Sequence, residues 1–166
     1  MADKDLKKIF SEKVIESQGI IHKVCRMYCD NSEHRKDLFQ EILIQLWKSY
    51  PSFRNESKFS TWMYRVALNV AIQELRKTKK KNSFFVQTNQ FKEEFEENNS
   101  SLEDERLAQM YKAISHLNKV EKAIVMLHLD EKSNEEIAEI VGITQNYVRV
   151  KMNRIKIKLS KKIKEA

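Results

Sequence analysis

The fold of this protein is decided by residues 133–159, SNEEIAEIVGITQNYVRVKMNRIKIKL. Ser133 and Glu136 have the spacing of a capping box, which predicts that a short helix begins here. Gly142 can end that helix, because glycine adopts the left-handed backbone of a helix C-terminus without steric cost. Thr144 can then cap a second, longer helix. Two helices joined by such a tight turn have the spacing of a helix-turn-helix motif.

The second helix of this motif has an apolar face and a polar face. Its apolar residues recur at spacings of four, three and four, which predicts a stripe packed on a domain core: Val148, Met152, Ile155 and Leu159. At about 100° per residue, the opposite face carries side chains able to contact base edges: Asn146, Arg149, Val150, Asn153 and Arg154. Residues 145–164 contain eight Lys and Arg and no acid, which suits contacts to DNA phosphates. Motif and charge together favour DNA reading, and the alternative is a basic surface helix.

The rest of the chain is also predicted to be helical. The 166 residues include two glycines and one proline, too few for the corners of a β-sandwich or for a glycine-rich phosphate loop. Apolar residues recur at helical spacing over 5–17, 20–29, 32–49, 60–80, 102–117 and 118–130. We expect Gly19 to separate the first two helices and Ser32 to cap the third. The prediction is an all-α protein of two small helical domains, the first of them a four-helix bundle.

Charge divides the chain into two basic parts and one acidic part. The net charge is +7 over residues 1–81, −6 over 82–105 and +6 over 106–166. The acidic part is also rich in Asn, Gln and Ser, a composition typical of a flexible linker. A basic part is either a solvated surface or a site for a polyanion such as nucleic acid. We therefore predict three segments: a helical domain over 1–81, an acidic linker over 82–102 and a helix-turn-helix domain over 103–166.

Aromatic and basic side chains alternate before and within the helix that begins near residue 60. Residues 52–69 read SFRNESKFSTWMYRVALN. Aromatic rings can stack on unpaired bases while cations hold phosphates, so this pattern is typical of single-stranded nucleic-acid binding. Asn69 lies one turn beyond Arg65 on the same helical face and can contact a base edge. The alternative is that Phe59 and Trp62 belong to the core, as large aromatic residues commonly do.

Three runs of the sequence together carry a family resemblance. They are DLFQEILIQLW at 37–47, FRNESKFSTWMYRVALN at 53–69 and LNKVEKAIVMLHLDEKSNEEIAEIVGITQNYVRVKMNRIKIKL at 117–159. In this order they resemble regions two and four of the extracytoplasmic-function (ECF) sigma factors of bacterial RNA polymerase. The resemblance implies a protein that binds core polymerase, recognises promoter DNA and helps to melt it so that transcription is initiated.

The resemblance also implies a role for particular residues. Binding to the clamp helices of the largest polymerase subunit is implied for polar residues of one helix, Asp37, Gln40, Glu41 and Gln45. Capture of a flipped base of the melted minus-ten element is implied for Lys58, Phe59, Ser60, Thr61, Trp62, Arg65 and Asn69. Recognition of the minus-thirty-five element is expected from Thr144, Asn146, Arg149, Val150, Lys151, Asn153 and Arg154.

Further expectations concern the linker, the partners and the location of the protein. In the resembled family the linker threads the RNA exit path, where an acidic strand can mimic nucleic acid, and a solvated spacer is the alternative. An anti-sigma factor is a further implied partner. No catalytic constellation is found, so we expect no enzyme activity and no cofactor, with the polymerase supplying the chemistry. Neither an apolar run of about 20 residues nor a signal-peptide core is present, so we expect a cytoplasmic protein without membrane insertion.

Other functions and one other site stay open at this level. The first alternative is a stand-alone helix-turn-helix transcription regulator in which residues 1–81 form a dimerisation or sensor bundle. The second is a protein-binding helical adaptor. The candidate metal ligands His22, Cys25, Cys29 and His34 lie within 13 positions. Their spacing matches no standard zinc pattern, and we expect no metal.

Overall fold

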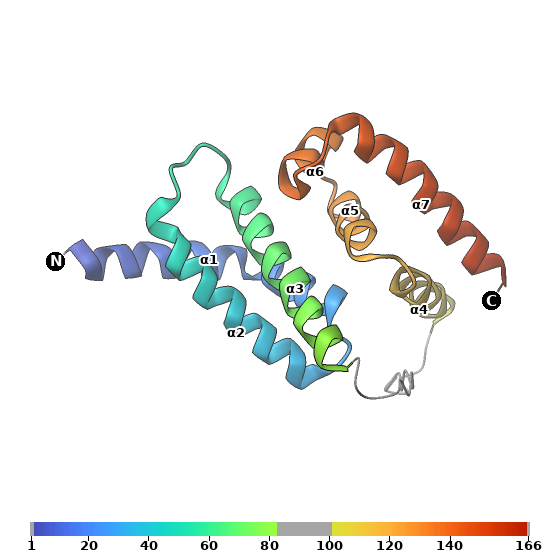
Figure 1. Ribbon diagram of the computed structural model, residues 1–166, viewed down its shortest axis with the longest axis horizontal. Helices are drawn as coiled ribbons and strands as arrows, with labels where there is room; N and C mark the ends of the chain where they lie inside the picture. The colour runs from blue at the N-terminus through green and yellow to red at the C-terminus, as the bar shows by residue number, and fades with distance from the viewer. Residues whose placement is uncertain (1, 83–100, 166) are drawn as a thin grey trace. The chain divides into compact units, whose positions relative to one another are not determined.

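The computed structural model describes residues 2–82 and 101–165. Every regular element in those residues is a helix (Figure 1), in the order α1 (Ala2–Tyr28), α2 (Ser32–Ser49), η1 (Tyr50–Ser52), α3 (Phe59–Asn82), α4 (Leu102–Ser115), α5 (Lys119–Leu129), α6 (Asn134–Val141) and α7 (Gln145–Glu165). The chain splits into two compact units, one built mainly from α1 to α3 and the other mainly from α4 to α7. The predicted all-α fold is confirmed. The expected linker over 82–102 lies for the most part outside the described residues, so the domain boundaries stay a prediction.

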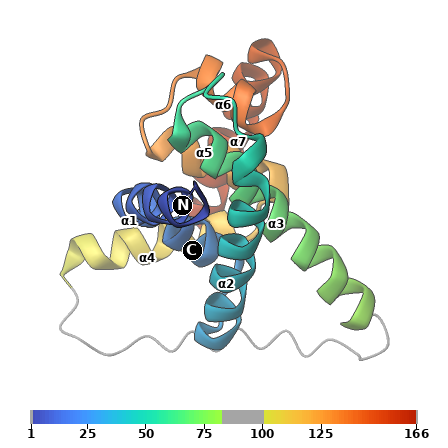
Figure 2. The same cartoon turned by 90° about the vertical axis from the view of Figure 1, so that its left-hand side faces the viewer.

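In the first unit, three helices share one apolar core. α1 packs against α2, and the chain then turns back through η1 into α3 (Figure 2). Each helix contributes side chains with no exposed surface, among them Ile21, Ile42, Leu46, Met63 and Tyr64. Burying a large apolar side chain contributes about 1.5–3 kcal/mol, so this core holds the three helices together.

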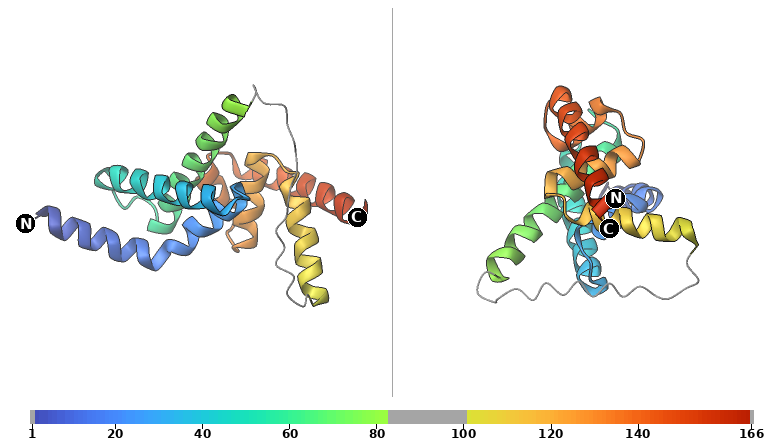
Figure 3. Two further views of the ribbon diagram at one scale, coloured as in Figure 1. Left: turned by 90° about the horizontal axis from the view of Figure 1, so that it is seen from below. Right: turned by 90° about the vertical axis from the view of Figure 1, so that its right-hand side faces the viewer.

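α1 is one helix, and the predicted break at Gly19 is wrong. Its buried residues continue at helical spacing from Phe10 to Tyr28, and Gly19 lies on the exposed side. Glycine inside a helix costs only about 1 kcal/mol relative to alanine, which packing before and after it outweighs. The helix bends near its middle without breaking (Figure 3). The first unit is therefore a three-helix bundle and not the predicted four-helix bundle.

The N-cap of α2 is Asn31, so the prediction that Ser32 caps this helix is wrong. The Oδ1 atom of Asn31 accepts hydrogen bonds from the backbone N–H groups of Glu33, at 2.8 Å, and His34, at 3.4 Å. Asparagine and serine are about equally good caps, so two neighbouring candidates are not distinguished by residue type. The structure places Ser32 as the first helical residue.

In the second unit, α7 packs against α4 and α5. Its core is made of residues with about 1% exposure or less from four helices, namely Ile114, Ile124, Leu127, Ile137 and Ile155. Three of the four helices, α4, α5 and α6, begin with complete capping boxes. The unit is therefore fixed by apolar burial inside and by capped helix ends outside.

Candidate nucleic-acid interface

The turn between α6 and α7 is built as the sequence predicts. The N–H of Glu136 donates to Ser133 Oγ at 3.1 Å, and a Glu136 carboxylate oxygen accepts from the N–H of Ser133 at 2.9 Å. Gly142 has a φ of +79°, the left-handed conformation that favours glycine. Thr144 Oγ1 accepts from the N–H of Tyr147 at 3.1 Å and caps α7. These local bonds set where α7 begins.

α7 presents the predicted polar face to solvent. Val148, Met152 and Ile155 are buried, which turns the other side of the helix outward. Six predicted minus-thirty-five residues are exposed: Thr144, Asn146, Arg149, Val150, Asn153 and Arg154. They comprise amide, guanidinium and apolar groups, the set that can pair with adenine and guanine edges and contact a thymine methyl.

Lys151 differs from the other predicted residues of α7. Its side chain is only 19% exposed, and its Nζ lies 4.0 Å from an oxygen of Glu121. The same amine lies 5.6 Å from the centre of the Tyr147 ring. The structure therefore directs this lysine along the flank of α7, toward α5.

Glu121, the partner of Lys151, lies three residues after Asn118, the spacing of a helix-start signal, and the sequence gives no sign that it is buried. It is 2% exposed and is the third residue of α5. Its Oε2 accepts from the N–H of Asn118 at 3.1 Å, and its Oε1 accepts from Lys158 Nζ at 2.6 Å. Burial raises the pKa of this carboxyl. The Lys158 hydrogen bond, the Asn118 N–H and the two lysine charges together lower the pKa by more than burial raises it, so the pKa of Glu121 lies below the ordinary value. Glu121 is therefore an ionised group that ties α7 to α5.

The aromatic side chains near the start of α3 pack on one another. Phe59 and Trp62 have ring centres 5.3 Å apart, and each also contacts Phe53, at 5.9 and 5.0 Å. Tyr50 joins this cluster at 6.1 Å from Trp62 and is itself 5.0 Å from Phe10. The alternative in which Phe59 and Trp62 belong to the core therefore describes much of their packing, although both stay partly exposed.

The remaining predicted minus-ten residues differ from one another in how far their side chains are exposed. Lys58, Arg65 and Asn69 are exposed, Ser60 is half-buried and Thr61 is buried. The backbone carbonyl of Lys58 accepts from the N–H of Trp62 at 3.1 Å, so this residue closes the first turn of α3. Arg65 and Asn69 project one turn apart from the same helix, as expected.

The predicted polymerase-binding residues lie along α2. Asp37 and Gln40 are exposed, and Glu41 and Gln45 are half-buried, with Gln45 Nε2 donating to Glu41 Oε1 at 3.2 Å. Sequence reasoning missed Ile44, which is 46% exposed and falls on the same face as Gln40 and Glu41 at helical spacing. The signal for it was an isoleucine outside the buried stripe of α2.

The candidate metal ligands do not form a cluster in the described part of the chain. No group of three or more His, Cys, Asp or Glu residues there could hold a metal ion. The His22 ring lies 4.7 Å from the Phe39 ring, and both cysteines are free. Burial, together with the neighbouring Cys29, raises the pKa of the Cys25 thiol to about 12. A thiol of this kind stays protonated at neutral pH.

Comparisons with known proteins fit the two units. Residues 14–81 match the family model of Sigma-70 region 2, and residues 107–159 match that of Sigma-70 region 4. The ECF RNA polymerase sigma factor SigW of Bacillus subtilis (strain 168) is 28% identical over 159 residues, 87% of this chain and 83% of that protein. The ECF RNA polymerase sigma-E factor of Escherichia coli (strain K12) is 26% identical over 167 residues, 94% of this chain and 87% of that protein.

The chain belongs to the ECF sigma factors. This ECF sigma factor shares its fold with two solved structures. One is the sigma factor RpoE of Bartonella quintana in complex with the anti-sigma factor NepR, with a TM-score of 0.73 and 18% identity over 95% of this chain and 98% of that chain. The other is CnrH in complex with the cytosolic domain of CnrY, with a TM-score of 0.66 and 16% identity over 93% of this chain and 86% of that chain.

The function follows from this membership. The protein is an RNA polymerase sigma factor that acts in transcription initiation and binds promoter DNA. The stand-alone regulator considered as an alternative is not favoured, because region 2 accompanies region 4 in one chain. Sigma factors as a family are non-enzymatic initiation factors. Among the described residues, no helix has the length and apolar character needed to span a bilayer.

Proposed function

We propose that the two units divide promoter recognition, with α7 reading the minus-thirty-five element as duplex and the start of α3 holding the melted minus-ten element. The observation that carries this proposal is the exposed face of α7, where Asn146, Arg149, Val150, Asn153 and Arg154 lie opposite a buried stripe. A helix with base-reading side chains in its first turns and cations beyond them suits the major groove. Thr144 caps this helix and lies at its entry.

Binding to a duplex that carries the selected minus-thirty-five element tests the role of α7. Arg149→Ala in the polymerase holoenzyme should weaken specific binding by about 5-fold to 150-fold, since one bidentate base contact is worth about 1–3 kcal/mol. Lys164→Ala is the matched control, because it removes an exposed cation from the far end of the same helix. If both variants weaken specific and random duplex equally, α7 does not read bases.

At the minus-ten element, Lys58, Arg65 and Asn69 supply exposed polar groups beside the aromatic cluster of Tyr50, Phe53, Phe59 and Trp62. We infer that the partly exposed rings of Phe59 and Trp62, with Ser60 and Thr61 behind them, form a wall of the pocket for a flipped base. Stacking and hydrogen bonds there offset an unstacking cost of a few kcal/mol.

A short single-stranded oligonucleotide with the non-template minus-ten sequence tests the pocket. Asn69→Ala in the holoenzyme should weaken binding of this oligonucleotide and leave minus-thirty-five duplex binding unchanged. Gln73→Ala, one turn further along α3 and also exposed, should change neither. Equal binding by the Asn69→Ala variant and the parent protein would remove Asn69 from the pocket.

We propose that core polymerase binds one face of α2. This face carries Asp37, Gln40, Glu41, Gln45 and the exposed Ile44. An exposed isoleucine among polar groups suits a helical partner such as the clamp helices of the largest subunit. Ile44→Lys should abolish co-purification with core polymerase while the circular dichroism spectrum stays unchanged. Ile15→Lys introduces the same charge at another exposed isoleucine and should retain binding. Loss of binding in both variants would contradict this assignment.

The remaining proposals concern regulation and location. An anti-sigma factor is proposed as a partner, and the structural relatives support it because RpoE was solved in complex with the anti-sigma factor NepR. We propose that the chain acts in the cytoplasm, where promoter DNA and core polymerase are found, without a cofactor or catalytic residue of its own. The proposed division is 1–81 for region two, 82–102 for the linker and 103–166 for region four, in keeping with the two family matches.

A further inference from the structure

Glu121 is an unusual side chain for a helix N-terminus because it is almost completely buried. Among the described residues, the buried polar or charged side chains are Thr61 and Glu121. A glutamate at this position of a capping box needs one backbone N–H as its partner, and Asn118 supplies it at 3.1 Å. The other oxygen, Oε1, faces two lysines of α7, with Lys158 Nζ at 2.6 Å and Lys151 Nζ at 4.0 Å. The carboxylate of Glu121 therefore interacts with two lysines of α7, the helix that we assign to DNA binding.

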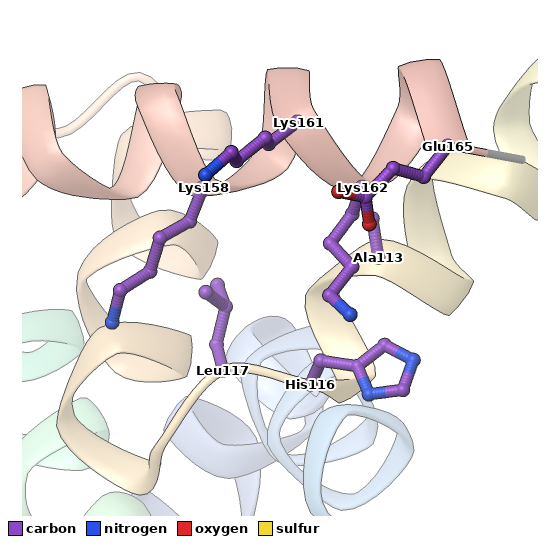
Figure 4. Close-up of a pocket in the computed structure, with 7 residues that line it drawn as sticks. All are labelled: Ala113, His116, Leu117, Lys158, Lys161, Lys162 and Glu165. Carbon is purple, nitrogen blue, oxygen red and sulfur yellow. The ribbon is translucent and has the colours of Figure 1, made fainter.

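The two lysines lie on the flank of α7 and away from its reading face. They are seven residues apart, which places them on one side of a helix. At about 100° per residue, Lys151 is about 100° around the helix from Val150, the centre of the exposed face. Figure 4 shows Lys158 reaching past Leu117 with its amine turned away from Lys162 and His116. Both amines are thus drawn toward α5.

We propose that Glu121 is a positioning residue for DNA recognition, which holds α7 on α5 and keeps Lys151 and Lys158 from DNA phosphates. This inference rests on the proposed reading of duplex DNA by α7. Phosphate contacts add affinity without sequence information. By pairing with both amines inside the unit, Glu121 limits sequence-independent binding and leaves DNA contacts to the exposed residues of α7. Lys151, expected from the sequence among the base readers, then serves the packing of α7.

The salt dependence of binding to a random duplex measures this property directly. Each phosphate contact changes the slope of log K against log salt by about 0.9 for duplex DNA. With the full-length protein and a labelled duplex between about 50 and 200 mM salt, Lys151→Gln should leave the slope unchanged. Arg154→Gln should make it shallower by about 0.9, because Arg154 is exposed on the reading side. Both replacements remove one cation from the surface of α7, so their difference reports which one contacts phosphate.

Glu121→Gln provides the converse test. It should steepen the slope by about 0.9 for each lysine that is released, whereas a purely structural role would lower affinity without steepening the slope. Adding Lys151→Gln to Glu121→Gln should reverse the part of this change that is due to Lys151. Glu139→Gln removes the same charge from an exposed position of α6 and should leave the slope as it is.

Two results would overturn the inference. One is a Lys151→Gln slope as shallow as that of Arg154→Gln, and this variant stays informative even if Glu121→Gln does not fold. The other is a Glu121→Gln slope equal to that of Glu139→Gln. Failure of the underlying function looks different, because Arg154→Gln would then leave the slope of the parent protein unchanged. That result removes the role of α7 in DNA binding and this inference with it.

Discussion

Replacing Glu121 by alanine should destabilise the second unit and leave the first unchanged. The substitution deletes the acceptor of the Asn118 N–H, at 3.1 Å, and of Lys158 Nζ, at 2.6 Å. It keeps one cap bond, because the N–H of residue 121 still donates to Asn118 Oδ1, at 2.9 Å in the parent protein. The loss is therefore confined to the carboxylate.

The size of the effect follows from the surroundings of each partner. A hydrogen bond to a charged group contributes about 1.5–3 kcal/mol, and the Asn118 N–H loses this acceptor. Lys158 is 55% exposed, so its amine regains water and its share is that of a surface pair, about 0–1 kcal/mol. The expected destabilisation of the second unit is about 1.5–4 kcal/mol.

Two spectroscopic signals separate the units. The chain has two tryptophans, and both Trp47 and Trp62 belong to the first unit. Tryptophan fluorescence therefore follows unfolding of the first unit, while circular dichroism follows the helices of both. In urea, with a slope of about 1 kcal/mol per molar for so small a unit, the dichroism transition of the second unit should move down by about 1.5 M or more. The fluorescence midpoint should not move.

Glu139→Ala is the control, because it removes an exposed acid from α6 and leaves the buried carboxylate of α5 in place. It should shift the dichroism transition by less than about 0.5 kcal/mol. The reasoning is refuted if Glu121→Ala behaves like this control, or if the fluorescence midpoint falls as far as the dichroism midpoint.

Three further predictions use the same signals. Gly19→Ala should stabilise the first unit by about 0.5–1 kcal/mol, measured by fluorescence, since this glycine is helical with open space around it. Gly142→Ala should destabilise the turn between α6 and α7 by about 1 kcal/mol, measured by dichroism, since its φ is +79°. A change of the opposite sign in either variant would contradict its prediction. The pKa of Glu121 is lowered on folding, so the stabilisation that its ionised carboxylate gives the protein should be complete above about pH 4.5. This stabilisation should decline as the pH falls through the lowered pKa. An acid titration of the Glu121→Gln variant should lack this component. Burial raises the pKa of both Cys25 and Cys29, so a thiol reagent at pH about 8 should label them slowly in native protein and fast in urea; rapid native labelling would disprove this.

Much of the second unit could be predicted because its signals are local. The capping boxes at Asn118 and Ser133, the turn at Gly142 and the cap at Thr144 each depend on a few neighbouring residues. The alternation of buried and exposed residues along α7 follows from helical periodicity alone. In the first unit, the same local reasoning failed at Gly19, because packing over the whole length of α1 outweighed one unfavourable residue.

By itself, the sequence determined the helical content, the helix-turn-helix and the side of α7 that faces solvent, because these depend on interactions between residues a few positions apart. Only the tertiary structure decided that Glu121 pairs with Lys158, 37 positions away, and that Tyr50 and Phe53 join Phe59 and Trp62. Helical periodicity gives the direction in which a side chain leaves its helix, but not which other helix it meets. That partner is fixed by the packing of whole helices, in which burial of apolar surface brings charged and aromatic groups together.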